Sequence, residues 1–354
     1  MLNHLKTWGT FTTLSCVSFI GAMFVAPSCA EDLRAMSFNI RYGAAKDGDD
    51  HWKKRNWLVA DTVRKFNPDL LGTQETLKFQ ADYLERQLRD YTYFGRSRMK
   101  TPNEHCGIFF RTDRFTQLAG GHFWLSESPE IPESKSWDSS LPRMASWVLL
   151  NDRLDEAARP ILFVNTHFDH RGKVARLESA KLIRQRIDRL RAISDNPLVV
   201  VTGDFNTPEG SEPYNAFLEG NADLIDSYRA KHPEKSDEEG TFNGFRGRTG
   251  GGRIDWVLAS PDFGVLSAEI DRHQEEGRYP SDHFPVTAVL RKPTTGLTWL
   301  DRTTIRAGAG IGRETRTLMM MVRPRIIIPE ETDEPVLGTT TQGETVQLPN
   351  FTTK

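Results

Sequence analysis

Two apolar segments of the chain end on side chains that could bind a metal ion and a phosphate group. Residues 198–202 lead into Asp204 and Asn206, and Asp282 and His283 directly precede a second apolar run. Carboxylate and amide oxygens are ligands that Mg²⁺ and Mn²⁺ prefer, and an imidazole can bind a phosphate oxygen or carry a proton near neutral pH. Either pair alone is common, but two segment ends of the same composition predict one shared site.

Further segments of strand length also end on, or contain, carboxylate, amide or imidazole side chains. Asn39 ends one run, Glu75 follows another, His167 follows a third and Asp255 lies in a fourth. Hydrolysis of a phosphate ester needs a divalent cation on the phosphate oxygens, a base for the attacking water and charge relief for the leaving oxygen. If the segment ends meet at one edge of the fold, these residues can supply all three.

Two interpretations are open for Asp169 and His170, which follow His167 closely. They could line the site, or they could cap a helix that begins near Lys173. The run Thr166-His167-Phe168-Asp169-His170 is also similar to part of the zinc-binding run of metallo-β-lactamase-like enzymes, which leaves a zinc hydrolase as a remote alternative. The first histidine pair of that run is missing here.

Strand-like and helix-like segments alternate along the chain and must position these residues. Continuous apolar runs, typical of strands buried on both faces, span 35–40, 69–73, 107–111, 145–150, 161–165, 198–202, 254–259 and 284–290. Apolar residues at helical spacing span 57–66, 77–88 and 174–193. Alternating elements without an internal repeat predict a layered α/β domain.

Six short motifs, in order along the chain, resemble the endonuclease/exonuclease/phosphatase superfamily. They are Ser37-Phe38-Asn39-Ile40, Gly72-Thr73-Gln74-Glu75, Asn165-Thr166-His167, Gly203-Asp204-Phe205-Asn206, Ile254-Asp255-Trp256 and Ser281-Asp282-His283. The resemblance runs from Met36 to about Leu290 and implies an α/β (α+β) four-layer sandwich, with two mixed β-sheets face to face and helices on both outer faces. Ile40-Arg41-Tyr42-Gly43 and Phe123-Trp124-Leu125-Ser126 look like an exported bacterial branch of the superfamily.

The resemblance implies a metal site and a set of supporting residues. Glu75 would be the main carboxylate ligand of Mg²⁺ or Mn²⁺, with Asn39 and Asp282 near the same ion. Glu104 would orient His167, and Arg143 would contact the phosphate.

The resemblance also implies five catalytic residues: His167, Asp204, Asn206, Asp255 and His283. Asp204 and Asn206 would position the attacking water and the phosphate, and Asp204 could carry a proton to the leaving group. Asp255 would orient the ring of His283 and raise its basicity, while His167 would donate to the phosphoryl oxygens.

These residues predict a phosphoesterase, and we expect nuclease-like hydrolysis of a phosphodiester. A phosphomonoester or a lipid or small-molecule phosphodiester is the alternative substrate, and a non-catalytic exported binding module is a remote alternative. A nuclease should carry basic residues around the site, and the candidates are Lys53, Lys54, Arg55, Arg96, Arg98, Lys100, Arg246, Arg248 and Arg253. No overall basic field supports nucleic-acid binding, because the chain without residues 1–30 has 45 basic and 48 acidic residues, a net charge of −3.

The two ends of the 354-residue chain differ in composition from its middle. Residues 1–30 are expected to be a signal peptide, since a short apolar stretch follows Lys6 and small residues precede Glu31. This predicts export to the periplasm or the outside of the cell, without stable membrane insertion; Cys29 could instead accept a lipid, but the usual preceding leucine is absent. Residues 31–292 form the predicted catalytic domain, residues 293–354 a low-complexity, disordered tail, and we expect a monomer.

Overall fold

The computed structural model describes residues 32–155, 158–218, 224–293, 337–339 and 345–347. The predicted signal peptide lies outside these residues, as does most of the predicted tail. Within the tail, β13 (Leu337–Thr339) pairs antiparallel with β14 (Thr345–Gln347). Among the described residues, no helix combines the length and the apolar composition needed to cross a membrane.

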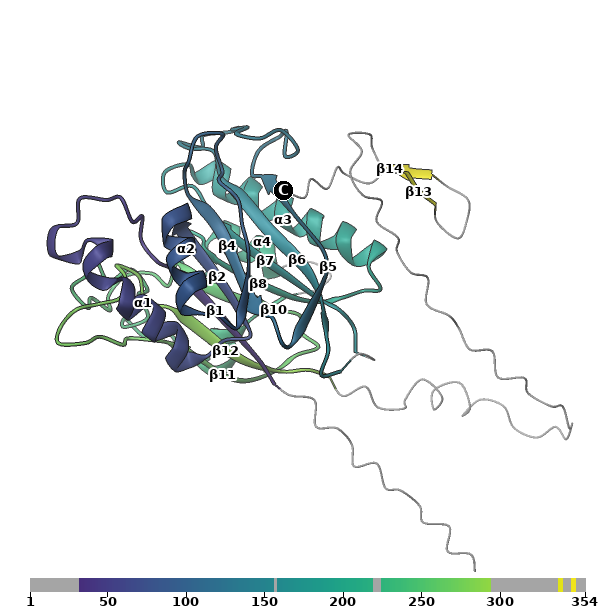
Figure 1. Cartoon of the computed structure of the whole chain (residues 1–354). Coiled ribbons are helices and arrows are strands. Elements are labelled where there is room, and N and C mark those ends of the chain that lie inside the picture. Colours follow the sequence, from purple (N-terminus) through teal and green to yellow (C-terminus); the bar gives the residue numbers. More distant parts are fainter. Residues whose placement is uncertain (1–31, 156–157, 219–223, 294–336, 340–344, 348–354) are drawn as a thin grey trace, which may run out of the picture.

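Residues 32–293 form two six-stranded mixed sheets (Figure 1). The first sheet has the order β11-β12-β1-β2-β4-β3 and contains β1 (Leu33–Asn39), β2 (Leu70–Thr76), β3 (Tyr91–Phe94), β4 (His105–Arg111), β11 (Gly264–Ile270) and β12 (Val286–Arg291). The second has the order β5-β6-β7-β8-β10-β9 and contains β5 (Phe115–Trp124), β6 (Met144–Asp152), β7 (Ile161–His167), β8 (Leu198–Asp204), β9 (Ile225–Asp226) and β10 (Asp255–Ala259). The pairs β1–β2 and β7–β8 are parallel, and the other pairs are antiparallel.

Helices cover both outer faces of the sheets, as the sequence predicted. α1 (Trp52–Phe66) and α2 (Lys78–Gln87) pack on the first sheet, and α3 (Lys173–Ile193) and α4 (Glu212–Leu218) on the second. The short η1 (Gly48–Asp50) precedes α1, and α5 (Ser227–Lys231) follows β9. Alternate residues of a strand face the other sheet and the helices, so β8 buries Val200 between the sheets and Val201 under α3. The predicted four-layer sandwich is therefore confirmed.

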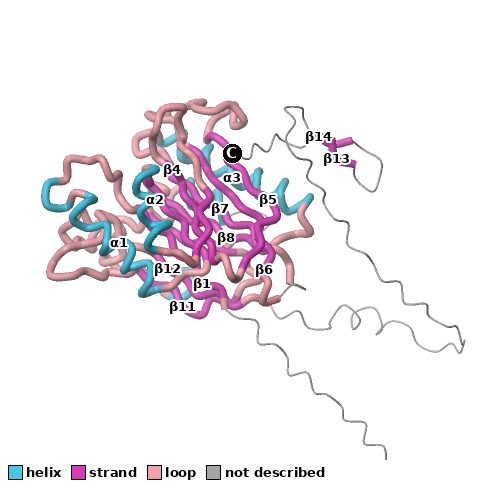
Figure 2. Tube along the Cα trace, in the orientation of Figure 1, coloured by secondary structure: helices cyan, strands magenta, loops and turns pink. Residues whose placement is uncertain are grey.

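The strand register brings the carboxyl ends of β1, β2, β7 and β8 and the starts of β4, β6, β10 and β12 to one edge. In the parallel pairs, Asn39 lies opposite Gln74 and His167 opposite Asp204. β10 runs antiparallel to β8 and places Asp255 opposite Asp204. Figure 2 shows long loops beyond the strands, beside α1 and above β4. The edge is thus built from both sheets and bordered by loops.

Candidate active site

The predicted site residues from the two sheets meet at this edge through Asn39. Its amide Nδ2 donates to Glu75 Oε1 at 3.1 Å and to Asp204 Oδ2 at 2.9 Å. Asn39 and Glu75 belong to the first sheet and Asp204 to the second, so this buried amide joins the two. Asn206 follows in a left-handed conformation (φ 50°), donating its backbone N–H to Asp204 Oδ1 at 3.0 Å.

A β-bulge turns Glu75 toward the site. The pairing of β2 with β4 shifts between Thr73 and Thr76, and Glu75 has a positive φ of 58°, which is uncommon for a residue with a side chain. Its Oε2 accepts a hydrogen bond from the backbone N–H of Tyr42 at 2.7 Å. The bulge and this bond fix the position of the carboxylate.

The acidic groups at the edge fit a divalent cation. Ligand atoms of Glu75, His167 and Asp204 lie within 4.8 Å of one another, as do those of Asp204, Asp255 and His283. Burial and the nearby Asp255 raise the pKa of Asp204 to about 7, and burial raises the pKa of Asp282. Clustered carboxylates with raised pKa values are the groups whose charge a cation would neutralise.

Asp282 lies at this edge but not in either of these groups of three. Its carboxylate faces the Arg41 guanidinium, with 3.5 Å between Nη1 and Oδ2. Arg41 was not among the predicted site residues; its place directly after the Asn39 motif was the available signal.

His283 and Asp255 form a buried pair on the other side of Asp204. His283 Nδ1 lies 2.9 Å from Asp255 Oδ2, and His283 Nε2 lies 3.8 Å from Asp204 Oδ2. Burial alone would lower the pKa of His283, but Asp255 and Asp204 outweigh it and hold that pKa well above its usual value. The imidazole is therefore a cation at neutral pH, with Nε2–H available as a donor.

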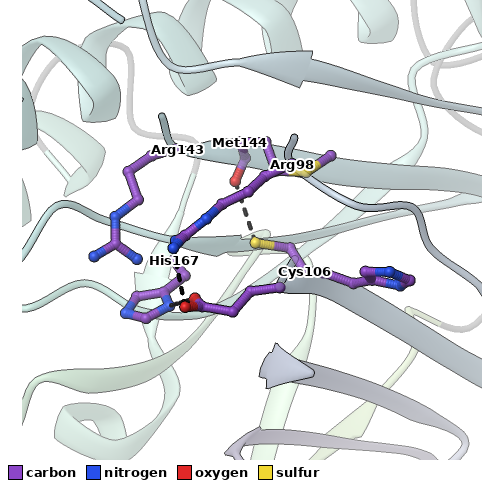
Figure 3. A pocket seen from close by; sticks show the side chains of 7 residues that line it. Arg98, Cys106, Arg143, Met144 and His167 are labelled. Atoms are coloured by element: carbon purple, nitrogen blue, oxygen red, sulfur yellow. Dashed lines mark hydrogen bonds and ion pairs between the residues drawn. The ribbon is translucent and has the colours of Figure 1, made fainter. Parts of the chain in front are cut away.

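His167 approaches the same carboxylate oxygen and has the opposite charge state. Its Nε2 lies 3.4 Å from Asp204 Oδ2, and its Nδ1 lies 3.8 Å from Glu104 Oε2. His167 lines one pocket together with Arg98 and Arg143 (Figure 3). Glu104 is also paired with Arg98 at 2.9 Å. Burial, Arg143 and Arg98 lower the pKa of His167 well below its usual value, so the ring is neutral.

Asp169 and His170 support Arg143 and the loop before α3. The carboxylate of Asp169 accepts hydrogen bonds from the Gly172 amide, at 2.8 Å, and from the Ser140 hydroxyl, at 2.7 Å. His170 Nδ1 lies 3.1 Å from Arg143 Nη2. Both oxygens of Asp169 are thus used by the loop, whereas the first N–H groups of α3, at Val174 and Ala175, donate to Asp138, so Asp169 does not cap this helix. Arg143 lines the pocket of His167, and its buried Nη1 has no hydrogen-bond partner among the described residues.

The structure also reveals an aromatic side chain at the site that the sequence did not indicate. Phe242 pairs with His283 in an isolated β-bridge, and the two rings lie 5.3 Å apart in an edge-to-face arrangement. The Phe242 side chain is nevertheless 48% exposed. No apolar run surrounds it, so only the strand register of the folded chain brings it to the site.

Three of the predicted flanking basic residues are not available to a ligand. Arg55, Arg98 and Arg253 are 0%, 6% and 2% exposed. Arg98 and Arg253 are paired with acids, and Arg55 donates to backbone carbonyl oxygens. Among the flanking candidates, Lys53, Lys54, Lys100, Arg246 and Arg248 are exposed, and Arg96 is half-buried.

Comparison with known proteins agrees with this geometry. The Endonuclease/Exonuclease/phosphatase family model matches residues 36–283. A solved structure of a family protein from Bacteroides thetaiotaomicron is 36% identical with a TM-score of 0.66, covering 73% of this chain and 97% of that chain. A mannosyl-6-phosphatase from the same organism is 35% identical with a TM-score of 0.65, covering 73% and 99%. Mouse nocturnin is 23% identical over 72% of this chain, which spans 63% of that protein's length.

Proposed function

Because the chain belongs to the endonuclease/exonuclease/phosphatase family, we propose that it hydrolyses sugar phosphate monoesters with Mg²⁺ or Mn²⁺ as its cofactor. The chain is a phosphoester hydrolase by family. The observation that carries the chemistry is the convergence of two imidazoles and the Asn39 amide on Asp204 Oδ2. The monoester is supported by the similarity to the mannosyl-6-phosphatase, which extends over nearly all of that protein.

Each residue of the site has a defined part in this proposal. Glu75, with Asn39 and Asp282 nearby, would hold the cation, which when bound would neutralise charge on the phosphoryl oxygens. The imidazolium of His283, oriented by Asp255, donates Nε2–H to a phosphoryl oxygen. Neutral His167, with its single proton on Nε2, would donate to a second oxygen of the phosphate.

Asp204 is the group suited to move a proton. Its pKa of about 7 allows the carboxylate to take a proton from the attacking water and return it to the leaving oxygen at neutral pH. Asn39 keeps Oδ2 of this carboxylate at the centre of the site. Arg143, with an unpaired buried N–H, is the group placed to neutralise further charge on a terminal phosphate.

A nucleic-acid phosphodiester is the second candidate, favoured by the loop that carries Phe242. This exposed ring contacts His283, and Arg246 and Arg248 of the same loop are also exposed. An aromatic platform beside two cations could hold a base and a neighbouring phosphate. The buried state of Arg55, Arg98 and Arg253 weakens the original expectation of a nuclease.

A substrate panel tests the proposal. Purified protein is assayed with Mg²⁺ or Mn²⁺ on mannose 6-phosphate, p-nitrophenyl phosphate, bis(p-nitrophenyl) phosphate, plasmid DNA and RNA. We expect mannose 6-phosphate to be hydrolysed faster than either the diester or the nucleic acids, and EDTA to abolish the activity. Faster diester cleavage would favour the second candidate. Full activity in both Asp204→Ala and His283→Ala would refute the assigned site.

We further propose that the protein is exported, on the strength of the apolar stretch that precedes Glu31. Mass spectrometry of the protein from its native cells should find a mature chain that begins at Glu31. A chain that retains Met1 and fractionates with the cytosol would contradict this.

A further inference from the structure

A groove of about 550 Å³ lies between α1 and α2, next to the predicted metal ligands. Gly43 and Ala44 form one edge of the groove. The preceding residue, Tyr42, donates its N–H to Glu75, and α2 begins three residues after Glu75. Because neighbouring Cα atoms are about 3.8 Å apart, only a thin wall of backbone separates the groove from the site. The groove therefore begins one residue beyond the backbone that holds the Glu75 carboxylate.

The wall between the site and the groove is held by one side chain. Gln80 Oε1 accepts hydrogen bonds from the N–H groups of Gly43 and Leu77, at 2.9 and 3.0 Å, and Gln80 Nε2 donates to the Arg41 carbonyl at 2.9 Å. A side chain at position 43 would collide with Gln80, since a Cβ there would lie 2.5 Å from its Cδ. Glycine at this position keeps the wall thin.

The groove is lined by basic and not by acidic side chains. His51, Lys53 and Arg86 line it, and no lining residue is acidic. Lys53 and Arg86 are exposed and form no ion pair with any part of the chain that the structure describes. Lys54 and Lys78, on the same helices but outside the groove, are both paired with aspartates, Asp49 and Asp82. Lys53 and Arg86 are thus exposed cations that a ligand in the groove can reach.

Aromatic side chains form the apolar part of the lining. Trp52 and Tyr83 pack edge to face with 5.7 Å between ring centroids, and Phe79 is 46% exposed. The side chain of Asn56 adds an amide. The exposed ring of Phe79, beside an amide and cations, suits a ligand ring that carries hydroxyl and anionic groups.

We infer that this groove is a second substrate subsite, which binds a sugar ring carrying an anionic group of its own, beyond the phosphate that is removed. The identity of the ring as a sugar rests on the proposed function; the preference for an anion rests on the groove. Lys53 and Arg86 bind the anion, and Phe79 packs against the ring.

The inference is tested by binding, without hydrolysis. Calorimetry in EDTA compares a disaccharide with a phosphate at each end and the same disaccharide with one phosphate. Lys53→Ala combined with Arg86→Ala should weaken binding of the doubly phosphorylated ligand about tenfold or more, and leave the singly phosphorylated ligand within about twofold. The charge-matched control is Lys54→Ala combined with Arg89→Ala, which removes two cations of the same region outside the groove.

A kinetic comparison with the metal-loaded enzyme gives a second readout. The groove variant should raise KM for the doubly phosphorylated disaccharide without changing kcat, and Phe79→Ala should raise KM for both disaccharides but not for mannose 6-phosphate. An equal loss with both disaccharides in the charge variant, or no loss, would overturn the inference. So would a single-stranded oligonucleotide that competes more strongly than the sugar. If no phosphomonoester is hydrolysed but the calorimetric difference persists, the proposed function fails and the anion subsite stands.

Discussion

Two buried arginines hold the two halves of the site, and they do so with different partners. The metal-side half comprises Asn39, Glu75 and Asp282, and the histidine-side half comprises Asp204, Asn206, Asp255 and His283. Arg55, from α1, serves the metal-side half. Its Nη1 donates to the carbonyl oxygens of Ile40 and Pro280, at 2.9 and 2.7 Å. It thereby ties the residue after Asn39 to the segment that carries Asp282.

Arg253 serves the histidine-side half with carboxylate partners. Its Nη2 lies 2.8 Å from Glu209, in the turn after Asn206, and also pairs with Asp226. The two connected segments are in close contact, because a Cβ on Gly252 would lie 2.6 Å from Cβ of Pro208. Arg253 thus links the turn after Asn206 to the strand that begins with Asp255.

The difference between the partners sets the charge of each half. The guanidinium of Arg55 has no carboxylate partner among the described residues, and its positive charge partly offsets the burial that raises the pKa of Asp282. Burial lowers its own pKa to about 10, which still leaves it charged at neutral pH. The charge of Arg253 is neutralised by Glu209 and Asp226, so it does not oppose protonation of His283. The metal-side half is therefore suited to carboxylates that bind a metal cation. The histidine-side half is suited to a protonated histidine that donates a hydrogen bond.

The largest effect is expected from removing the cationic donor itself. His283→Ala should lower kcat by about 10²- to 10⁴-fold, since it removes both the charge and the N–H near the phosphate, while Mn²⁺ affinity should change little. Steady-state kinetics and a Mn²⁺ titration check this. His273→Ala, a histidine away from the site, is the control and should retain full activity. A lost Mn²⁺ affinity in His283→Ala would mean that the two halves are not separate.

A substitution in the metal-side half should have the reverse pattern. Glu75→Gln keeps an oxygen for the Tyr42 N–H but removes the negative charge, so Mn²⁺ affinity should fall at least about tenfold. Titration followed by electron paramagnetic resonance measures it without any turnover. Glu85→Gln, on the exposed face of α2, should bind Mn²⁺ as the unmodified protein does. Equal losses in Glu75→Gln and Asp255→Asn would contradict the division into halves.

The partners of the two arginines predict different pH dependence of stability. Arg253→Met leaves Glu209 and Asp226 without their shared cation and should cost about 3–5 kcal/mol at pH 7. The cost should shrink at pH 4, because Glu209, which keeps only Arg229 and Lys235, is protonated more readily in the variant. Arg55→Met mainly leaves carbonyl oxygens unsatisfied, and carbonyls do not titrate, so its cost should change much less between the two values, through its effect on Asp282 alone. Urea unfolding at the two pH values measures both. A parallel change in the two variants would show that the partners do not matter.

The sequence predicted the central strands and their terminal residues because burial on both faces leaves a continuous apolar run. β8, predicted over residues 198–202, is formed by Leu198–Asp204. The edge strands β5 and β11 were not predicted, since they have one neighbour and expose polar residues such as Thr116 and Gln117. Their composition resembles that of a loop.

The candidate catalytic and metal-binding residues could be predicted from the sequence, but the residues that hold them in position could not. A motif places Asp255 at a strand end, whereas nothing in the local sequence around Arg253 distinguishes a buried, paired arginine from an exposed one. Its partners Glu209 and Asp226 lie 44 and 27 residues away and meet it only in the fold. The same limitation made Arg55 and Arg98 look like candidates for nucleic-acid binding.

The smallest expected effect concerns Glu209 alone. Burial would raise its pKa, but hydrogen bonds from Arg229 and Arg253 lower it from 4.5 to about 2. A carboxylate with a lowered pKa in the folded state adds stability above pH 4.5 and loses it as the pH falls toward 2. The melting temperature of the unmodified protein should therefore fall over this window, and that of Glu209→Gln should fall less steeply from a lower starting value. Glu212→Gln, an exposed neighbour, should follow the unmodified protein. If the melting temperatures of Glu209→Gln and the unmodified protein fall with the same slope, the link between the turn after Asn206 and β10 does not depend on this ion pair. Close packing of Pro208 against Gly252 would then suffice to hold the two segments together.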